Sequence, residues 1–174
     1  MKKLLIISST KNTNLDLSYE IKKFLDKLGG IETEILSLEE YELPLFTPTL
    51  EEKFKKENTF PETIGNLKDI LLNSSAIIWC SPEYNGGISP IVTNTIAWIS
   101  RATKDWKEAF NNKKILICSS SGGNGKNFVK GFKIQLKYLG SDVSEDFIIQ
   151  TKKDHYDEEN FNNILNIFYK KIIN

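Results

Sequence analysis

Three short segments, rich in hydroxyl, amide and glycine residues, are the parts of this sequence best suited to hold a ligand. They read SSTKNTN (8–14), SPEYNGGIS (81–89) and SSSGGNGKN (119–127). The chain's single His lies elsewhere, in the polar stretch TKKDHYDEEN, and no catalytic triad can be assembled around it. Backbone amides, hydroxyls and glycines instead favour a bound group that carries its own reactivity. No catalytic acid or base is therefore expected.

The first segment directly precedes residues 14–28, whose apolar side chains recur on one face as in an amphipathic helix. Backbone N–H groups at a helix start, the positive end of the helix dipole and Lys11 would together hold a phosphate. A capping cluster would use the same residues, because Asn12, Thr13 or Asn14 could accept hydrogen bonds from the first amides of the helix. The sequence leaves both interpretations open.

The second segment combines two glycines with the start of another helix. Gly86 and Gly87 permit positive φ and let the backbone approach a planar ring closely. Ser89 and Pro90 are typical of an N-cap and of the first residue of a helix, whose dipole would favour partial negative charge on a ligand nearby. An ordinary tight turn is the alternative interpretation.

The third segment is similar to the phosphate-binding loop of nucleoside triphosphatases, but it lacks two required residues. Ser120 stands where the first glycine is needed, and Asn127 stands where a Ser or Thr would bind magnesium. This class of enzyme is therefore excluded, and no metal site is predicted. A ligand-binding loop and a flexible connection remain as alternatives.

Apolar runs of strand length alternate with amphipathic segments along the whole chain. The expected strands are 3–8, 31–37, 75–81, 114–120 and 143–150, and the expected helices are 14–28, 61–73, 89–103, 126–139 and 157–172. This alternation predicts one α/β domain over residues 1–174, a flavodoxin-like three-layer α/β/α sandwich with a five-stranded parallel sheet of order 2-1-3-4-5. Ligands of such sheets bind beyond the carboxyl ends of the strands, where the winding direction reverses. The three segments should meet there.

Charge and hydropathy limit the partners. The 23 Lys and Arg residues balance 23 Asp and Glu residues, which argues against nucleic acid and against an anionic membrane surface. No apolar run reaches the length of a membrane span, and the N-terminal run predicts a buried strand, so we expect a cytoplasmic protein. Cys80 and Cys118 lie in apolar runs and are predicted to be reduced core residues.

The segment SPEYNGGISPIVTNTIAWISR (81–101) resembles the NADPH-dependent FMN reductase family of flavodoxin-like proteins, which includes quinone, azo-dye and chromate reductases. LPLF (43–46) and the SSSGG loop also match that family. Asn94, Trp98, Ser100 and Arg101 keep its pattern on the following helix. Thr93 and Ala97 replace the Lys and the Asp of that pattern. The first loop, SSTKNTN (8–14), also departs from the family's usual sequence.

The resemblance implies an FMN cofactor, with NADPH or NADH as the electron donor and a small molecule such as a quinone, free flavin or another electrophile as the acceptor. Hydride transfer would be carried by the flavin, and the protein would supply position and electrostatics. By resemblance, the residues that would border FMN are Ser9, Lys11, Thr13, Asn14, Pro82, Glu83, Tyr84, Asn85, Gly86, Ser119, Ser120, Ser121, Gly122 and Gly123.

Other classes of protein are weaker matches. A phosphoacceptor signalling domain would need acidic residues where Ser8, Ser9 and Ser81 stand. The serious alternative is a flavin-binding, electron-carrier or interaction protein without efficient reductase turnover, because of Thr93, Ala97 and the altered first loop. His155 is interpreted as a solvated surface residue.

The helix over 89–103 is apolar around more of its circumference than one core-facing stripe requires. An additional covering surface is therefore expected, and the resemblance implies that a partner subunit supplies it. We accordingly predict a homodimer or homotetramer.

Overall fold

Five parallel strands form the central sheet of the computed structural model, which describes residues 1–174. The strands are β1 (Lys2–Ser8), β2 (Ile31–Ser37), β3 (Ala76–Cys80), β6 (Lys114–Ser121) and β7 (Asp142–Thr151). They are hydrogen-bonded in the order β2-β1-β3-β6-β7, and each neighbouring pair is parallel. The predicted order 2-1-3-4-5 is confirmed, and the winding direction reverses between β1 and β3.

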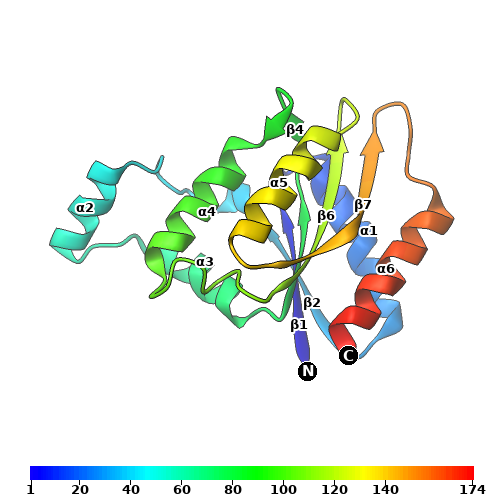
Figure 1. Cartoon of the computed structure of the whole chain (residues 1–174), viewed down its shortest axis with the longest axis horizontal. Helices are drawn as coiled ribbons and strands as arrows, with labels where there is room; N and C mark the ends of the chain where they lie inside the picture. The colour runs from blue at the N-terminus through cyan, green and yellow to red at the C-terminus, as the bar shows by residue number, and fades with distance from the viewer.

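Helices cover both faces of this sheet (Figure 1). On one face lie α1 (Thr13–Leu28) and α6 (Glu158–Ile173), and on the other lie α3 (Glu62–Asn73), α4 (Pro90–Ala102) and α5 (Lys126–Tyr138). A short 3-10 helix, η1 (Leu38–Glu40), follows β2. The three-layer α/β/α arrangement is thus confirmed. None of the helices is both long enough and apolar enough to span a bilayer.

Strand β1 shows why the strand sequences are continuous apolar runs. Leu4 and Ile6 belong to the core beneath α1 and α6, whereas Leu5 and Ile7 belong to the core on the opposite face. All four side chains are fully buried. Because each contributes about 1.5–3 kcal/mol by leaving water, both faces of the sheet must be covered, and helices alternate between them.

A small hairpin that the sequence did not predict follows β3. Its strands, β4 (Glu83–Tyr84) and β5 (Gly87–Ile88), pair antiparallel and leave Asn85 and Gly86 as a two-residue turn. Both turn residues have positive φ, 50° and 73°, as a type I′ turn requires. The tight-turn interpretation therefore accounts for Gly86. The hairpin also fixes the position of Tyr84, the residue just before the turn.

Another unpredicted element, α2 (Pro48–Glu57), lies beyond α4 and away from the sheet (Figure 1). Its segment covers the outer side of α4 through Trp98. The Trp98 ring packs against those of Phe46, Phe54 and Phe60, with centroids 5.1, 5.6 and 6.3 Å away. The Trp98 indole N–H also donates to the Pro44 carbonyl at 2.6 Å. Trp98 is consequently fully buried within one chain.

Asn94 reinforces the same contact. Its side-chain amide donates to the Pro44 carbonyl at 3.0 Å, and its carbonyl oxygen accepts from the Phe46 N–H at 2.8 Å. Asn94 and Trp98 therefore hold the LPLF segment against α4. The additional surface expected over α4 is supplied in part by the chain itself, so the apolar character of α4 does not by itself require a partner subunit.

We predict that Trp98→Ala lowers the free energy of unfolding by about 3–5 kcal/mol, because it opens a large cavity within the aromatic cluster and removes a hydrogen bond. Trp106→Ala is the matched control, since Trp106 is 39% exposed. Urea unfolding followed by far-UV circular dichroism measures both. Similar losses in the two variants would contradict the role given to the cluster.

Candidate functional site

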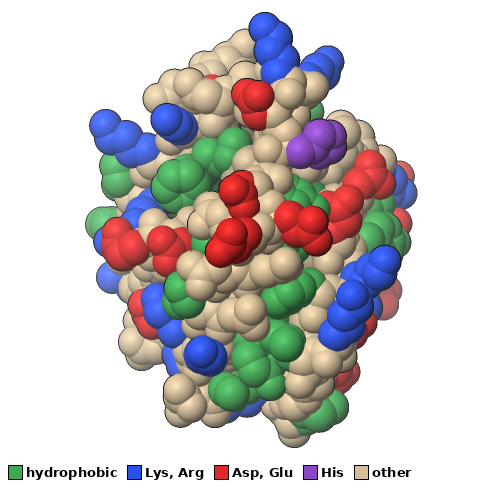
Figure 2. Space-filling view, turned by 90° about the vertical axis from the view of Figure 1, so that its right-hand side faces the viewer, with side chains coloured by type: hydrophobic (Ala, Val, Ile, Leu, Met, Phe, Trp, Pro, Cys, Tyr) green, Lys and Arg blue, Asp and Glu red, His purple; other side chains and the backbone are tan.

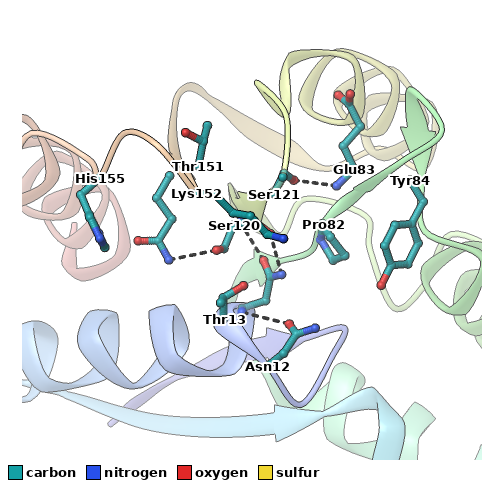
Figure 3. A pocket seen from close by; sticks show the side chains of 13 residues that line it. Asn12, Thr13, Pro82, Glu83, Tyr84, Ser120, Ser121, Thr151, Lys152 and His155 are labelled. Carbon is teal, nitrogen blue, oxygen red and sulfur yellow. Dashed lines mark hydrogen bonds between the residues drawn. The ribbon is translucent and has the colours of Figure 1, made fainter.

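A polar cavity of about 420 Å³ lies at the carboxyl edge of the sheet (Figure 3). It is bordered by the segments that follow β1, β3, β6 and β7, which is where the reversal of winding predicts a ligand site. The lining residues are Asn12, Thr13, Asn14, Pro82, Glu83, Tyr84, Ser120, Ser121, Gly122, Gln150, Thr151, Lys152 and His155. The three segments singled out in the sequence thus meet at one place.

The first loop combines a helix cap with free amides. The Asn12 side chain accepts a long hydrogen bond, 3.5 Å, from the Asn14 N–H, and it also accepts from the Thr10 hydroxyl at 2.6 Å. The backbone amides of Lys11, Asn12 and Thr13 donate to no group of the chain. Capping and ligand binding are therefore compatible here, because one amide is capped and three remain available to an acceptor.

Asn14 joins the first loop to the third. Its side-chain amide donates to the Ser120 carbonyl at 2.9 Å, and its carbonyl oxygen accepts from the Ser120 N–H at 2.8 Å. The residue is 1% exposed, so these two bonds satisfy a buried amide and hold the start of α1 against the end of β6. Asn14 acts here as a structural clamp.

Glu83 joins the second loop to α5. Its backbone N–H donates to the Ser121 hydroxyl at 2.8 Å, and its carboxylate accepts from the Phe128 N–H at 3.0 Å. Phe128 lies in the first turn of α5, where a carboxylate is favoured by free amides and by the helix dipole. The structure thus gives Glu83 the structural role of a helix cap.

The hydroxyls of the third loop are largely used within the protein. Those of Ser119 and Ser121 are hydrogen-bonded at 2.8 Å, and that of Ser120 accepts from the Gln150 side-chain amide at 3.0 Å. Gly122 is different, because a Cβ added there would meet no atom within 4 Å. The loop therefore presents an open backbone surface to the cavity at Gly122.

The sequence-predicted residues divide into two groups. Those that line the cavity are Thr13, Asn14, Pro82, Glu83, Tyr84, Ser120, Ser121 and Gly122, and those that do not are Ser9, Lys11, Asn85, Gly86, Ser119 and Gly123. The Lys11 ammonium lies 3.4 Å from the Glu40 carboxylate, and the buried Ser9 hydroxyl accepts from the Trp79 indole at 3.2 Å. Contact of each of these residues with FMN stays a prediction.

Sequence reasoning missed the wall that follows β7. Gln150, Thr151, Lys152 and His155 line the cavity, although the sequence there was interpreted only as a strand end and a solvated stretch. His155 is indeed exposed, yet it stands at the cavity's outer end (Figure 3). The predicted topology could have indicated this wall, because the fifth strand of a parallel sheet ends at the same carboxyl edge as the strands that precede the other loops.

The two thiols lie just below the loops. Cys80 and Cys118 are opposite each other on β3 and β6, and both are fully buried. Burial and the neighbouring Cys80 raise the pKa of Cys118 well above its ordinary value. The Cys118 thiol is consequently protonated, and both residues serve as small core side chains.

The sheet order, the helices on both faces and the cavity at the reversal point define a flavodoxin-like α/β protein. The family model for NADPH-dependent FMN reductases matches residues 1–152, and the chain belongs to that family. It is thus an oxidoreductase that uses FMN with a reduced nicotinamide nucleotide, as the sequence resemblance implied.

Several known proteins are similar to it. An uncharacterized protein of Mycoplasma pneumoniae is 24% identical over 162 residues, covering 91% of this chain and 92% of the relative. The NADPH:quinone oxidoreductase of Arabidopsis thaliana is 28% identical over 100 residues, covering 58% of this chain and 46% of the plant protein. The chain therefore aligns with only about half of that enzyme.

Solved structures share the fold. The flavoenzyme NAD(P)H:(acceptor) oxidoreductase FerB of Paracoccus denitrificans superposes with a TM-score of 0.72 at 18% identity, covering 99% of this chain and 98% of FerB. An FMN-dependent NADH-azoreductase of Bacillus anthracis, solved in complex with FMN, gives a TM-score of 0.63 at 15% identity, covering 99% of this chain and 96% of the azoreductase.

We predict that Asn14→Ala destabilises the protein by about 2–3 kcal/mol, because the Ser120 backbone loses both partners in a buried place. It should also weaken FMN binding, since the first and third loops lose their fixed spacing. Asn163→Ala, at an exposed position of α6, is the control and should leave both quantities nearly unchanged. Thermal unfolding and flavin fluorescence quenching measure the two effects.

Proposed function

We propose that this protein passes two electrons from NADPH or NADH, by way of FMN in the polar cavity, to a quinone, free flavin or another small electrophile. The observation that carries the proposal is the meeting of three ligand-type loops around one cavity at the reversal point of the sheet. The quinone is favoured among acceptors because the Arabidopsis thaliana relative is named for it. The whole chain would act as one FMN-binding domain.

The residues at the cavity fit this cofactor. Free amides at Asn12 and Thr13, next to that of Lys11 just outside the lining, suit a phosphate, and the open backbone beside Gly122 suits the edge or face of a flat ring. Pro82 and Tyr84 add apolar and planar surface to the wall of the cavity (Figure 3). When bound, FMN would supply the redox chemistry, and these residues would hold the ring and leave one side open to donor and acceptor.

The alternative, a flavin-binding or electron-carrier protein without efficient turnover, rests on Thr93 and Ala97, which depart from the family pattern. Both lie on α4, and neither lines the cavity. These two departures thus leave the cavity wall unchanged, and the altered first loop still offers free backbone amides at the cavity, which favours the enzyme. A homodimer or homotetramer and a cytoplasmic location stay predictions, and light scattering with bound FMN tests the first.

Reconstituted protein should show a flavin absorption spectrum and should oxidise NADPH or NADH faster when a quinone is added. We expect a steady-state panel of both nucleotides against a quinone, free flavin and an azo dye to identify the preferred pair. Flavin binding without acceptor-dependent oxidation of either nucleotide would instead support the carrier alternative.

We further predict that Gly122→Val weakens binding of FMN and riboflavin alike by about tenfold or more, because a branched side chain would occupy the space assigned to the ring. Stability should change by less than about 0.5 kcal/mol, since nothing lies within 4 Å of the new Cβ.

Gly65→Val on α3 is the matched control, because its Cβ also meets nothing within 4 Å and Gly65 does not line the cavity. It should bind both flavins as the wild type does. If the Gly122→Val protein bound FMN with the affinity of the wild type, the flavin ring could not lie on this side of the cavity.

A further inference from the structure

The fourth wall of the cavity is formed by the segment Thr151–Tyr156, most of which lies beyond the end of the family match at residue 152. Two of its side chains, Lys152 and His155, line the cavity. Figure 3 shows the Lys152 side chain reaching inward over the cavity and His155 at the outer end. This wall contributes basic nitrogen atoms, whereas the other three contribute mainly amides, hydroxyls and glycine.

The segment is held in place at its first residue. The Thr151 N–H donates to the Asp154 carbonyl at 2.8 Å, and the Thr151 hydroxyl accepts from the N–H groups of Asp154 and Lys153 at 2.9 and 3.2 Å. Thr151 itself is paired with Ser121 in the register of β6 and β7. The turn is therefore built onto the sheet.

Its last residue is held equally well. The Tyr156 ring stacks on Phe161 of α6 with centroids 4.2 Å apart, and the Tyr156 hydroxyl donates to the Glu20 carboxylate of α1 at 2.5 Å. Burial and Glu20 together raise the pKa of Tyr156, so this hydroxyl keeps its proton and remains a donor. Lys152 and His155 thus project from a segment fixed at both ends.

The basic groups of this wall have no acidic partner. No carboxylate lies within 4.0 Å of the Lys152 ammonium or of the His155 ring, and neither side chain forms a hydrogen bond within the chain. Lys11, by contrast, is paired with Glu40. The one carboxylate lining the cavity, Glu83, accepts from the Phe128 N–H. Figure 2 shows the single His side chain, in purple, exposed on the face that carries α6.

We propose that Lys152 and His155 form the basic, hydrogen-bond-donating side of a subsite for a phosphate monoester within this cavity. The inference rests on the proposed function, because the reaction's nucleotides offer two groups of this chemistry, the terminal phosphate of FMN and the 2′-phosphate of NADPH. A compact ammonium and an imidazole N–H suit such an anion, since both donate charge-assisted or polar hydrogen bonds to its oxygens. Lys152, and not Lys11, is then the principal cation at the site.

The test compares the Lys152→Ala/His155→Ala protein with wild type in two arms. Fluorescence titration with FMN and with riboflavin, which lacks the phosphate, reports on the cofactor. The KM values for NADPH and NADH, which differ only in the 2′-phosphate, report on the donor. In one of the two pairs, we expect the phosphorylated compound to bind about tenfold or more weakly, or to show a KM higher by that factor, while the value for its unphosphorylated counterpart is nearly unchanged.

Lys153→Ala is the matched control. It removes the same charge from the neighbouring position, which is exposed and does not line the cavity, and it should leave all four values as in wild type. Circular dichroism of both variants should match wild type, because the replaced side chains are exposed.

The proposed subsite would be overturned if the double variant changed FMN and riboflavin binding equally and the KM values of NADPH and NADH equally, or if it changed none of these values. The same selective loss in Lys153→Ala would also overturn it. These results differ from a failure of the proposed function, in which wild type itself would neither bind flavin nor oxidise NAD(P)H. Selective weakening of FMN would assign the subsite to the cofactor, and selective weakening of NADPH would assign it to the donor.

Discussion

The parallel sheet buried on both faces is the constraint on which the rest of this structure depends. Apolar side chains on both sides of β1, β3 and β6 leave water only if helices cover each face. Right-handed crossovers then bring the carboxyl ends of neighbouring strands to one edge, and the reversal between β1 and β3 opens a space there. The site is thus a consequence of how the core is buried.

Side-chain hydrogen bonds turn this edge into a defined cavity. Asn14 fixes the first loop to the third through both backbone groups of Ser120, and Glu83 fixes the second loop to α5. The polar residues closest to the strands are therefore mostly satisfied within the protein. What remains for a ligand is backbone N–H groups, the open surface at Gly122 and the basic wall after β7. Such a site positions a reactive group and supplies little acid–base chemistry of its own.

Residues that keep the family pattern on α4 serve the architecture. Asn94 and Trp98 hold residues 44–46, and the aromatic rings around Trp98 bury the outer side of α4 within one chain. Sequence reasoning assigned that apolar surface to a partner subunit, because it predicted no helix or strand between residues 37 and 61 that could cover it. The contribution of the segment containing α2 comes from Phe54 and from the flanking Phe46 and Phe60, which no periodicity connects to α4.

The sequence by itself determined the order of strands and helices, the parallel topology, the family and the three loops that share an edge. Each of these features depends on local periodicity or on the types of residues that lie close together in the chain. Only the tertiary structure decided which polar groups face the ligand. It paired Lys11 with Glu40, occupied the Asn14 and Glu83 side chains, and brought Lys152 and His155 to the cavity. These outcomes join residues up to more than a hundred positions apart, such as Asn14 and Ser120. Contacts of that kind depend on how the elements pack together, and no local pattern encodes them.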